Sequence, residues 1–160
     1  MSDTIKEHME IIVNALDEYE QSLNLPDVQN PCDKQEIQQY FSMKRDHIEK
    51  LSAEDCKQIA YRLSQFAFYI QRIYNREQAR MVWATSKLQD VIADNLNNFD
   101  KYTKHEMKIS LIKKQNKYAD SLDNILNYAS QREKRLHSLS FSIKNLADIM
   151  LANARGKTNV

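Results

Sequence analysis

The stretch YADSLDNILNYASQREKRLHSLSFSIKNLADIM, from Tyr118 to Met150, places apolar residues at alternating spacings of four and three. This is a 3.5-residue period held for more than four heptads, and it is typical of a left-handed coiled coil. The positions on this seam are Tyr118, Leu122, Ile125, Ala129, Arg132, Leu136, Leu139, Ile143, Leu146 and Met150. Arg132 is the one charged residue among them, and such a charge fixes register or partner number when it finds an acid.

The seam lies inside a run of 124 residues, 32–155, that contains neither glycine nor proline. Phosphate-cradling loops and nucleophile elbows need glycine for their backbone angles or for close approach of a ligand. Proline breaks a helix, because it removes a donor and clashes with the preceding turn. The run therefore predicts long helices and disfavours most nucleotide-binding loops.

Four helices are expected, over about 4–23, 34–51, 53–97 and 104–155. Capping-box patterns at Thr4, Ser52 and Thr103 open the first, third and fourth, and Asp33 opens the second. The linker from Asn24 to Pro31 holds both prolines, and a second break is expected at 100–102. Gly156 is expected as the C-cap residue of the last helix. The predicted domains are an acidic helix with its linker, 1–31, and a helical oligomerisation and DNA-binding domain, 32–160.

The length of the last helix bears on assembly. A helix of about 48 residues is about 70 Å long, whereas a compact domain of this size has a gyration radius of about 15 Å. Two such helices folded as a hairpin cannot bury both of their faces, so we expect the remaining seam to pack on copies of itself. We therefore expect an all-α fold in which two long antiparallel helices form a coiled-coil-like hairpin, with two shorter N-terminal helices, assembled as a homo-oligomer. The residues expected at the oligomer contact are Leu122, Ile125, Arg132, Leu136, Leu139, Ile143, Leu146 and Met150. The alternative is a monomeric four-helix bundle.

Composition bounds the class of protein further. The chain is 42% hydrophobic and 28% charged, and no apolar run approaches the ~20 residues of a membrane span. The first residues lack the pattern of a secretion signal, so we expect a cytoplasmic protein with no membrane partner. In a reducing cytoplasm Cys32 and Cys56 are expected as free structural thiols, the alternative being one disulfide.

Residues suited to catalysis or metal binding are scattered. His8, His47, His105 and His137 show no metal-ligand spacing with each other or with cysteine. Ser138, Ser140 and Ser142 cluster next to His137, and side chains at one- and two-residue offsets do not face each other on a helix. We expect no enzyme, no metal and no cofactor.

Charge is unevenly distributed along the chain. Residues 1–40 hold two lysines against nine acids, a net charge of −7, and residues 41–160 have a net charge of +8. This asymmetry favours a polyanion-binding surface or an internal clamp between the two parts. The alternative is an ordinary solvated surface with local bias.

Two basic features are candidate contacts for single-stranded DNA. Arg72, Arg76 and Arg80 recur every four residues, so they form one stripe on a helix; the alternative is that they pair with acids across a subunit contact. The second feature is a lysine cluster, Lys101, Lys104, Lys108, Lys113, Lys114 and Lys117. Lysine and arginine track phosphates, and nearby aromatics such as Phe99, Tyr102 and Tyr118 can stack bases. Alternatively, these cations solubilise a long helix and the aromatics are core.

Two short motifs carry a family resemblance. YTKHEMK, from Tyr102 to Lys108, has the pattern Y-x-K-x-E-M-K. FSIKNLADIM, from Phe141 to Met150, has the pattern F-x-I-K-x-L-x-D-I-M and is soon followed by Gly156 and Lys157. Both resemble the phage recombination mediator family, the UvsY-like proteins, over about residues 36–157.

The resemblance implies a small helical protein that forms rings, binds single-stranded DNA and helps to load a phage recombinase onto strands coated by the single-strand-binding protein. In a phage-encoded protein the location is the host cytoplasm. The matching positions are Tyr102, Lys104, Glu106, Met107, Lys108, Phe141, Ile143, Lys144 and Asp148. Ala93–Phe99 departs from the family, because it lacks the basic patch expected there, so the lysine cluster would take that role. The rival hypothesis is a coiled-coil adaptor that binds only proteins.

Overall fold

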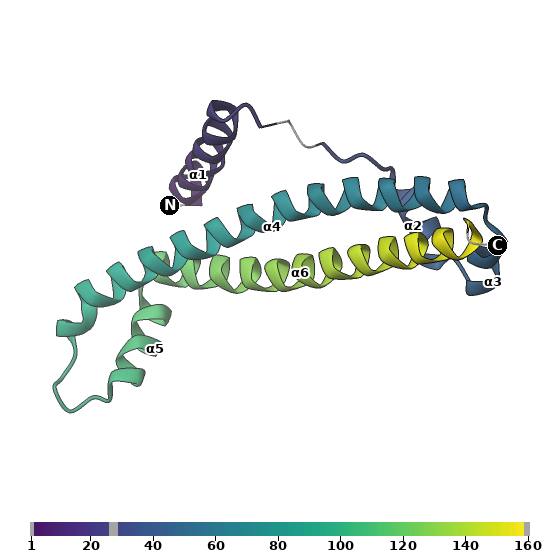
Figure 1. The fold of residues 1–160 in the computed structure, drawn as a ribbon. Helices are drawn as coiled ribbons and strands as arrows, with labels where there is room; N and C mark the ends of the chain where they lie inside the picture. The colour runs from purple at the N-terminus through teal and green to yellow at the C-terminus, as the bar shows by residue number, and fades with distance from the viewer. Residues whose placement is uncertain (1, 26–28, 159–160) are drawn as a thin grey trace. The chain divides into compact units, whose positions relative to one another are not determined.

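The computed structural model describes residues 2–25 and 29–158, with side chains from Ile5 onward. Every regular element in these ranges is a helix, so the predicted all-α class is confirmed (Figure 1). The elements are α1 (Ser2–Ser22), α2 (Lys34–Ser42), α3 (Arg45–Lys50), α4 (Ala53–Asn95), the 3₁₀ helix η1 (Leu96–Asn98), α5 (His105–Gln115) and α6 (Lys117–Thr158). Among these described helices, none has the length and apolar character to cross a membrane.

The predicted second helix is wrong in one respect, because it is two helices. Met43 and Lys44 adopt extended angles, and they separate α2 from α3. Side chains of α6 bind the end of α3: Lys157 Nζ donates to the carbonyl oxygens of Ile48, Glu49 and Leu51. These bonds add partners for carbonyls at the end of α3, where a helix leaves its last C=O groups unpaired, and they stabilise this short helix.

The predicted fourth helix is also divided, at Asn116, whose φ of −94° and ψ of 109° lie outside the helical region. Its side-chain Oδ1 accepts hydrogen bonds from the backbone N–H groups of Tyr118 (2.9 Å) and Ala119 (3.2 Å). Asn116 is thus the N-cap of α6, a role for which asparagine is among the preferred residues.

Two of the predicted helix starts are confirmed. The Asp55 backbone N–H donates to Ser52 Oγ (3.0 Å), and the Ser52 N–H donates back to Asp55 Oδ2 (3.2 Å), which completes a capping box. Asp33 caps α2 by accepting from the Glu36 N–H at 2.7 Å. The first helix begins at Ser2, and the predicted cap Thr4 has its side chain outside the described residues.

Two predicted caps are wrong. Lys104, not Thr103, precedes α5, and it makes no side-chain cap. The turn is held instead by Asp100, whose Oδ1 accepts from the Tyr102 N–H at 3.0 Å. Gly156 lies inside α6, which continues to Thr158, and it does not adopt the positive φ of a C-cap glycine.

By its contacts the chain forms two compact units. The second unit contains Asp27–Tyr74 and Arg135–Val160, so it joins the first part of α4 to the last part of α6. Asn153 Nδ2 lies 3.3 Å from Cys56 Sγ, and the Tyr74 and His137 rings lie 5.7 Å apart, so the two segments run antiparallel. The buried core is Cys32, Ile59, Ala60, Leu63, Phe66, Ala67, Ile70, Ile143, Ala147 and Met150, against which α2 and α3 pack.

The first unit contains Met1–Pro26 and Asn75–Lys134. Its apolar core joins the end of α4, α5 and the start of α6 through Leu88, Ile112, Ala119 and Leu122. The contacts also place α1 in this unit. Ile5 is buried, the His8 ring stacks on Trp83 with centroids 5.9 Å apart, and Asp17 forms an ion pair with Arg76.

Candidate nucleic-acid interface

The connection between α4 and α5 presents an unusually exposed aromatic ring. Tyr102 is 82% exposed, more than any other large hydrophobic side chain in the described residues. The Lys101 ammonium lies 5.0 Å from the centre of this ring, within the range of a cation–π contact. An exposed ring beside a cation offers a base a stacking surface and its phosphate a counter-charge.

The lysines around this ring extend onto α5. Lys104 precedes the helix and Lys108 follows one turn later, so these two share a side of α5. Lys114 and Lys117 are exposed at the other end of α5 and at the start of α6. Lys113 differs, because its Nζ binds Asp123 of α6 at 2.6 Å. Within the described part of the chain, the other five predicted lysines form no ion pair.

The arginine stripe on α4 has a different environment, since two of its members pair with acids of the same chain. Arg76 binds Asp17 of α1, and Arg80 binds Glu77 at 2.5 Å. Glu77 is only 4% exposed, and it also accepts from Arg132 Nε at 3.0 Å. Arg72 also interacts with another group of the protein. The predicted seam charge Arg132 thus finds an acid, and Arg76 and Arg80 meet acids without a second subunit.

The residues predicted for oligomerisation lie mainly against their own chain. Leu122, Ile143 and Met150 are fully buried, and Leu136, Leu139 and Leu146 pack half-buried against the core of the second unit. Ile125 is half-buried, and Arg132 forms an ion pair with Glu77.

Three of the ten predicted seam positions, Tyr118, Leu139 and Leu146, are displaced by one residue. The small side chains Ala119, Ser140 and Ala147 are buried, in place of the larger neighbours that precede them. Small residues allow two helices to approach closely, and the larger side chains then flank the contact.

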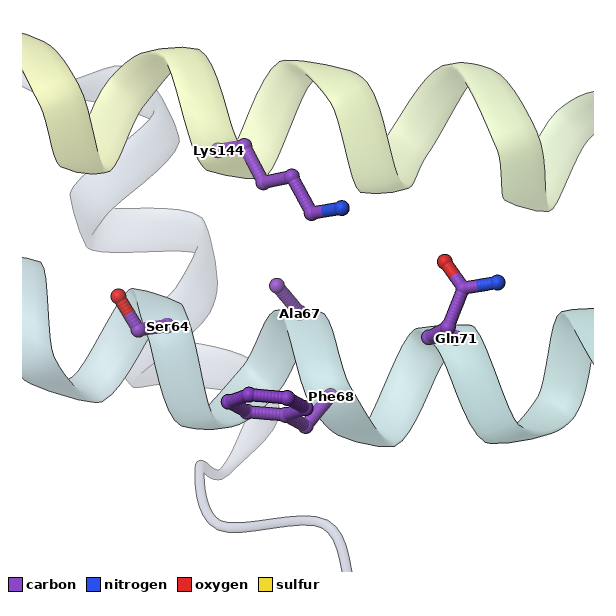
Figure 2. Close-up of a pocket in the computed structure, with 5 residues that line it drawn as sticks. All are labelled: Ser64, Ala67, Phe68, Gln71 and Lys144. Carbon is purple, nitrogen blue, oxygen red and sulfur yellow. The ribbon is translucent and has the colours of Figure 1, made fainter.

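A second surface of interest lies in the second unit and was not found from the sequence. Figure 2 shows Ser64, Ala67, Phe68 and Gln71 along α4, with Lys144 extending from α6 towards them. They line a mainly apolar cavity of about 270 Å³. Tyr61, Phe68 and Phe141 are 65%, 72% and 65% exposed. The only feature of the sequence that points to this surface is the pair Tyr61 and Phe68, which stand seven residues apart on α4 and outside its buried stripe.

The most strongly perturbed carboxylate of the described residues serves the fold. Glu36 accepts from Arg62 Nε and Nη2, each at 2.9 Å, and from the Tyr40 hydroxyl at 2.8 Å. The hydrogen bonds from Arg62 lower the pKa of Glu36 to about 2. Burial, and then the bond to Glu36, raises the pKa of Tyr40 to about 12. This cluster fastens α2 to α4, and it offers no group poised for proton transfer near neutral pH.

The remaining chemistry-bearing residues are dispersed. Cys32 and Cys56 are both buried and free, and burial raises the pKa of Cys32. No group of three metal-ligating side chains comes together within the ranges the structure describes.

The motif residues have mixed environments. Tyr102 and Lys104 are exposed at the α4–α5 connection, whereas Ile143 and Met150 are core residues and Lys157 binds the end of α3. Comparison of the chain with protein-family models, curated proteins and solved structures gives no match.

Proposed function

We propose that this chain is a non-catalytic, single-stranded-DNA-binding protein of the recombination-mediator kind that its two motifs resemble. The observation that supports this most directly is the exposed Tyr102 ring with the Lys101 ammonium 5.0 Å from its centre. In this proposal a base stacks on Tyr102, while Lys101, Lys104, Lys108, Lys114 and Lys117 hold phosphates. Counterion release supplies most of the affinity, and stacking is sequence-tolerant.

The proposal includes assembly. The antiparallel contacts within each unit support a coiled-coil-like hairpin of α4 and α6, and the exposed rings of Tyr61, Phe68 and Phe141 offer an apolar face to another copy. Exposed aromatic clusters on soluble proteins mark interaction sites, and aromatic residues are enriched at interfaces. A ring of copies would align several DNA sites for one strand. The recombinase and the single-strand-binding protein are the partners that the motif resemblance suggests.

A charge-reversal pair tests the DNA site. The double variant Lys104→Glu/Lys108→Glu places two acids beside Tyr102, so affinity for a fluorescent single-stranded oligonucleotide should fall at least tenfold. The matched control is Lys34→Glu/Lys44→Glu, which changes the net charge equally at exposed positions of the second unit. Light scattering should give the same mass for both variants and the wild type.

Equal loss of affinity in both double variants would mean that only the net charge matters, and it would contradict this site. Absence of binding by the wild type at low salt would instead favour the adaptor hypothesis, in which the chain binds only proteins.

A further inference from the structure

A second cavity lies in the first unit, beside the proposed DNA site. It has a volume of about 430 Å³, within the range of small-ligand sites. It is lined by residues from the end of α4, η1, the end of α5 and the cap of α6: Asn95, Asn98, Phe99, Ile112, Gln115 and Asn116. Four of these six side chains are carboxamides.

Hydrogen bonds to the protein fix the orientation of several of these amides. Asn95 Nδ2 donates to the Val91 carbonyl at 2.8 Å, and Asn98 Nδ2 donates to Asn95 Oδ1 at 3.3 Å. Asn116 Oδ1 accepts from two backbone N–H groups, so its Nδ2 must be the remaining donor.

Several polar atoms therefore stay available at the cavity. Asn98 Oδ1 can accept, Asn116 Nδ2 can donate, and the Gln115 amide can do both; within the described residues these groups have no other bond.

The lining selects a class of ligand. It contains no carboxylate or histidine to hold a cation and no lysine or arginine to hold a phosphate. A neutral, flat group with alternating donors and acceptors fits it better. Nucleobases have this character, and asparagine and glutamine pair with adenine through two hydrogen bonds. Phe99 and Ile112 supply an apolar wall for the face of such a ring.

We propose that this amide-lined cavity is a nucleobase site, which receives one unstacked base, preferably adenine, from the bound single strand. The inference rests on the proposed function and adds base recognition to it. Lys114 and Lys117 flank Gln115 and Asn116 in the sequence, and Lys101 follows Phe99 by two residues. Cations next to the cavity can hold the phosphates on either side of the inserted base.

Abasic DNA separates base binding from phosphate binding. We would measure anisotropy with the full-length protein, using an oligodeoxyadenylate and an abasic strand of the same length. The wild type should bind the adenine strand at least tenfold more tightly, since one bidentate contact to a base gives about this discrimination and stacking adds to it. The variant Asn98→Ala/Gln115→Ala should bind the adenine strand about tenfold more weakly than the wild type does. It should retain only the preference that stacking on Tyr102 supplies, and it should keep its affinity for the abasic strand.

The control is Asn127→Ala/Gln131→Ala, which removes two exposed amides of α6 outside the cavity and should bind both strands as the wild type does. Equal wild-type binding of the two strands would overturn the nucleobase site, together with base stacking on Tyr102, and would leave phosphate binding intact. An equal loss on both strands in Asn98→Ala/Gln115→Ala would also overturn it, because the amides would then serve the scaffold. If the protein bound neither strand, the proposed DNA-binding function itself would be contradicted.

Discussion

The ion pair between Glu36 and Arg62 joins two segments that are far apart in sequence, and it makes stability depend on pH. The native pKa of Glu36 is about 2, below the ordinary value of 4.5, so the unfolded chain binds its proton more readily. The stabilisation is present above the ordinary pKa and is lost as pH falls towards the native one.

We therefore predict that the urea midpoint falls between about pH 6 and about pH 3, and that Glu36→Gln shows a smaller fall. Circular dichroism would follow the loss of helix. Glu54→Gln is the matched control, because Glu54 is 73% exposed and faces Lys57 at 3.9 Å. An unchanged pH dependence in Glu36→Gln would show that other carboxylates dominate acid unfolding.

A substitution of Gly156 tests whether α6 continues through this residue. A Cβ added there meets no atom within 4 Å, and the residue has helical angles. Gly156→Ala should therefore raise the free energy of unfolding by about 0.5–1 kcal/mol, since alanine favours helix and restricts the unfolded chain.

The reverse change, Ala152→Gly at an exposed position of the same helix, should destabilise by a similar amount. Destabilisation by Gly156→Ala would instead indicate the left-handed C-cap that the sequence predicts.

At the scale of the element, caps were predictable where the deciding contact is local. Ser52 and Asp33 bond to N–H groups three residues away, so their patterns are visible in the sequence. The break between α2 and α3 was not predictable, because Asn153 and Lys157 hold α3 from more than 100 residues away. Asn116 was missed for another reason: an asparagine cap inside a polar, glycine-free run has little to distinguish it.

The same distinction applies to the site. The lysine cluster and Tyr102 are visible as composition, and Tyr102 and four of the six lysines are exposed. The sequence did not reveal that Lys113 is paired with Asp123 or that Asn95, Asn98 and Gln115 line one cavity, because these depend on how α5 packs.

The acidic helix α1 offers a test at the same scale. Asp17 pairs with Arg76, so we infer that the arm withholds this arginine from a bound strand. Asp17→Asn should release it, raise affinity for single-stranded DNA at low salt, and steepen the slope of log affinity against log salt by about 0.7, the share of one phosphate.

Glu18→Gln removes the same charge from an exposed neighbour and should leave the slope unchanged. Identical slopes for Asp17→Asn and the wild type would show that the arm does not compete with DNA.

At the scale of the whole molecule, the exposed rings of α4 and α6 bear on assembly. If copies associate through Phe68 and its neighbours, Phe68→Asp places a charge in an apolar contact and should lower the mass measured by light scattering. Tyr19→Asp changes an exposed ring on α1 and should leave the mass unchanged. A wild-type mass of about 19 kDa, that of one chain of 18.9 kDa, would contradict assembly altogether.

The most direct test of the central claim is the salt dependence of binding to a single-stranded oligonucleotide, measured by anisotropy over a series of salt concentrations. Five lysines at the α4–α5 connection, α5 and the start of α6 form no ion pair within the described residues. If each holds one phosphate, log affinity should fall against log salt with a slope of about −3.5. A slope near zero, or no binding at low salt, would contradict a DNA-binding function.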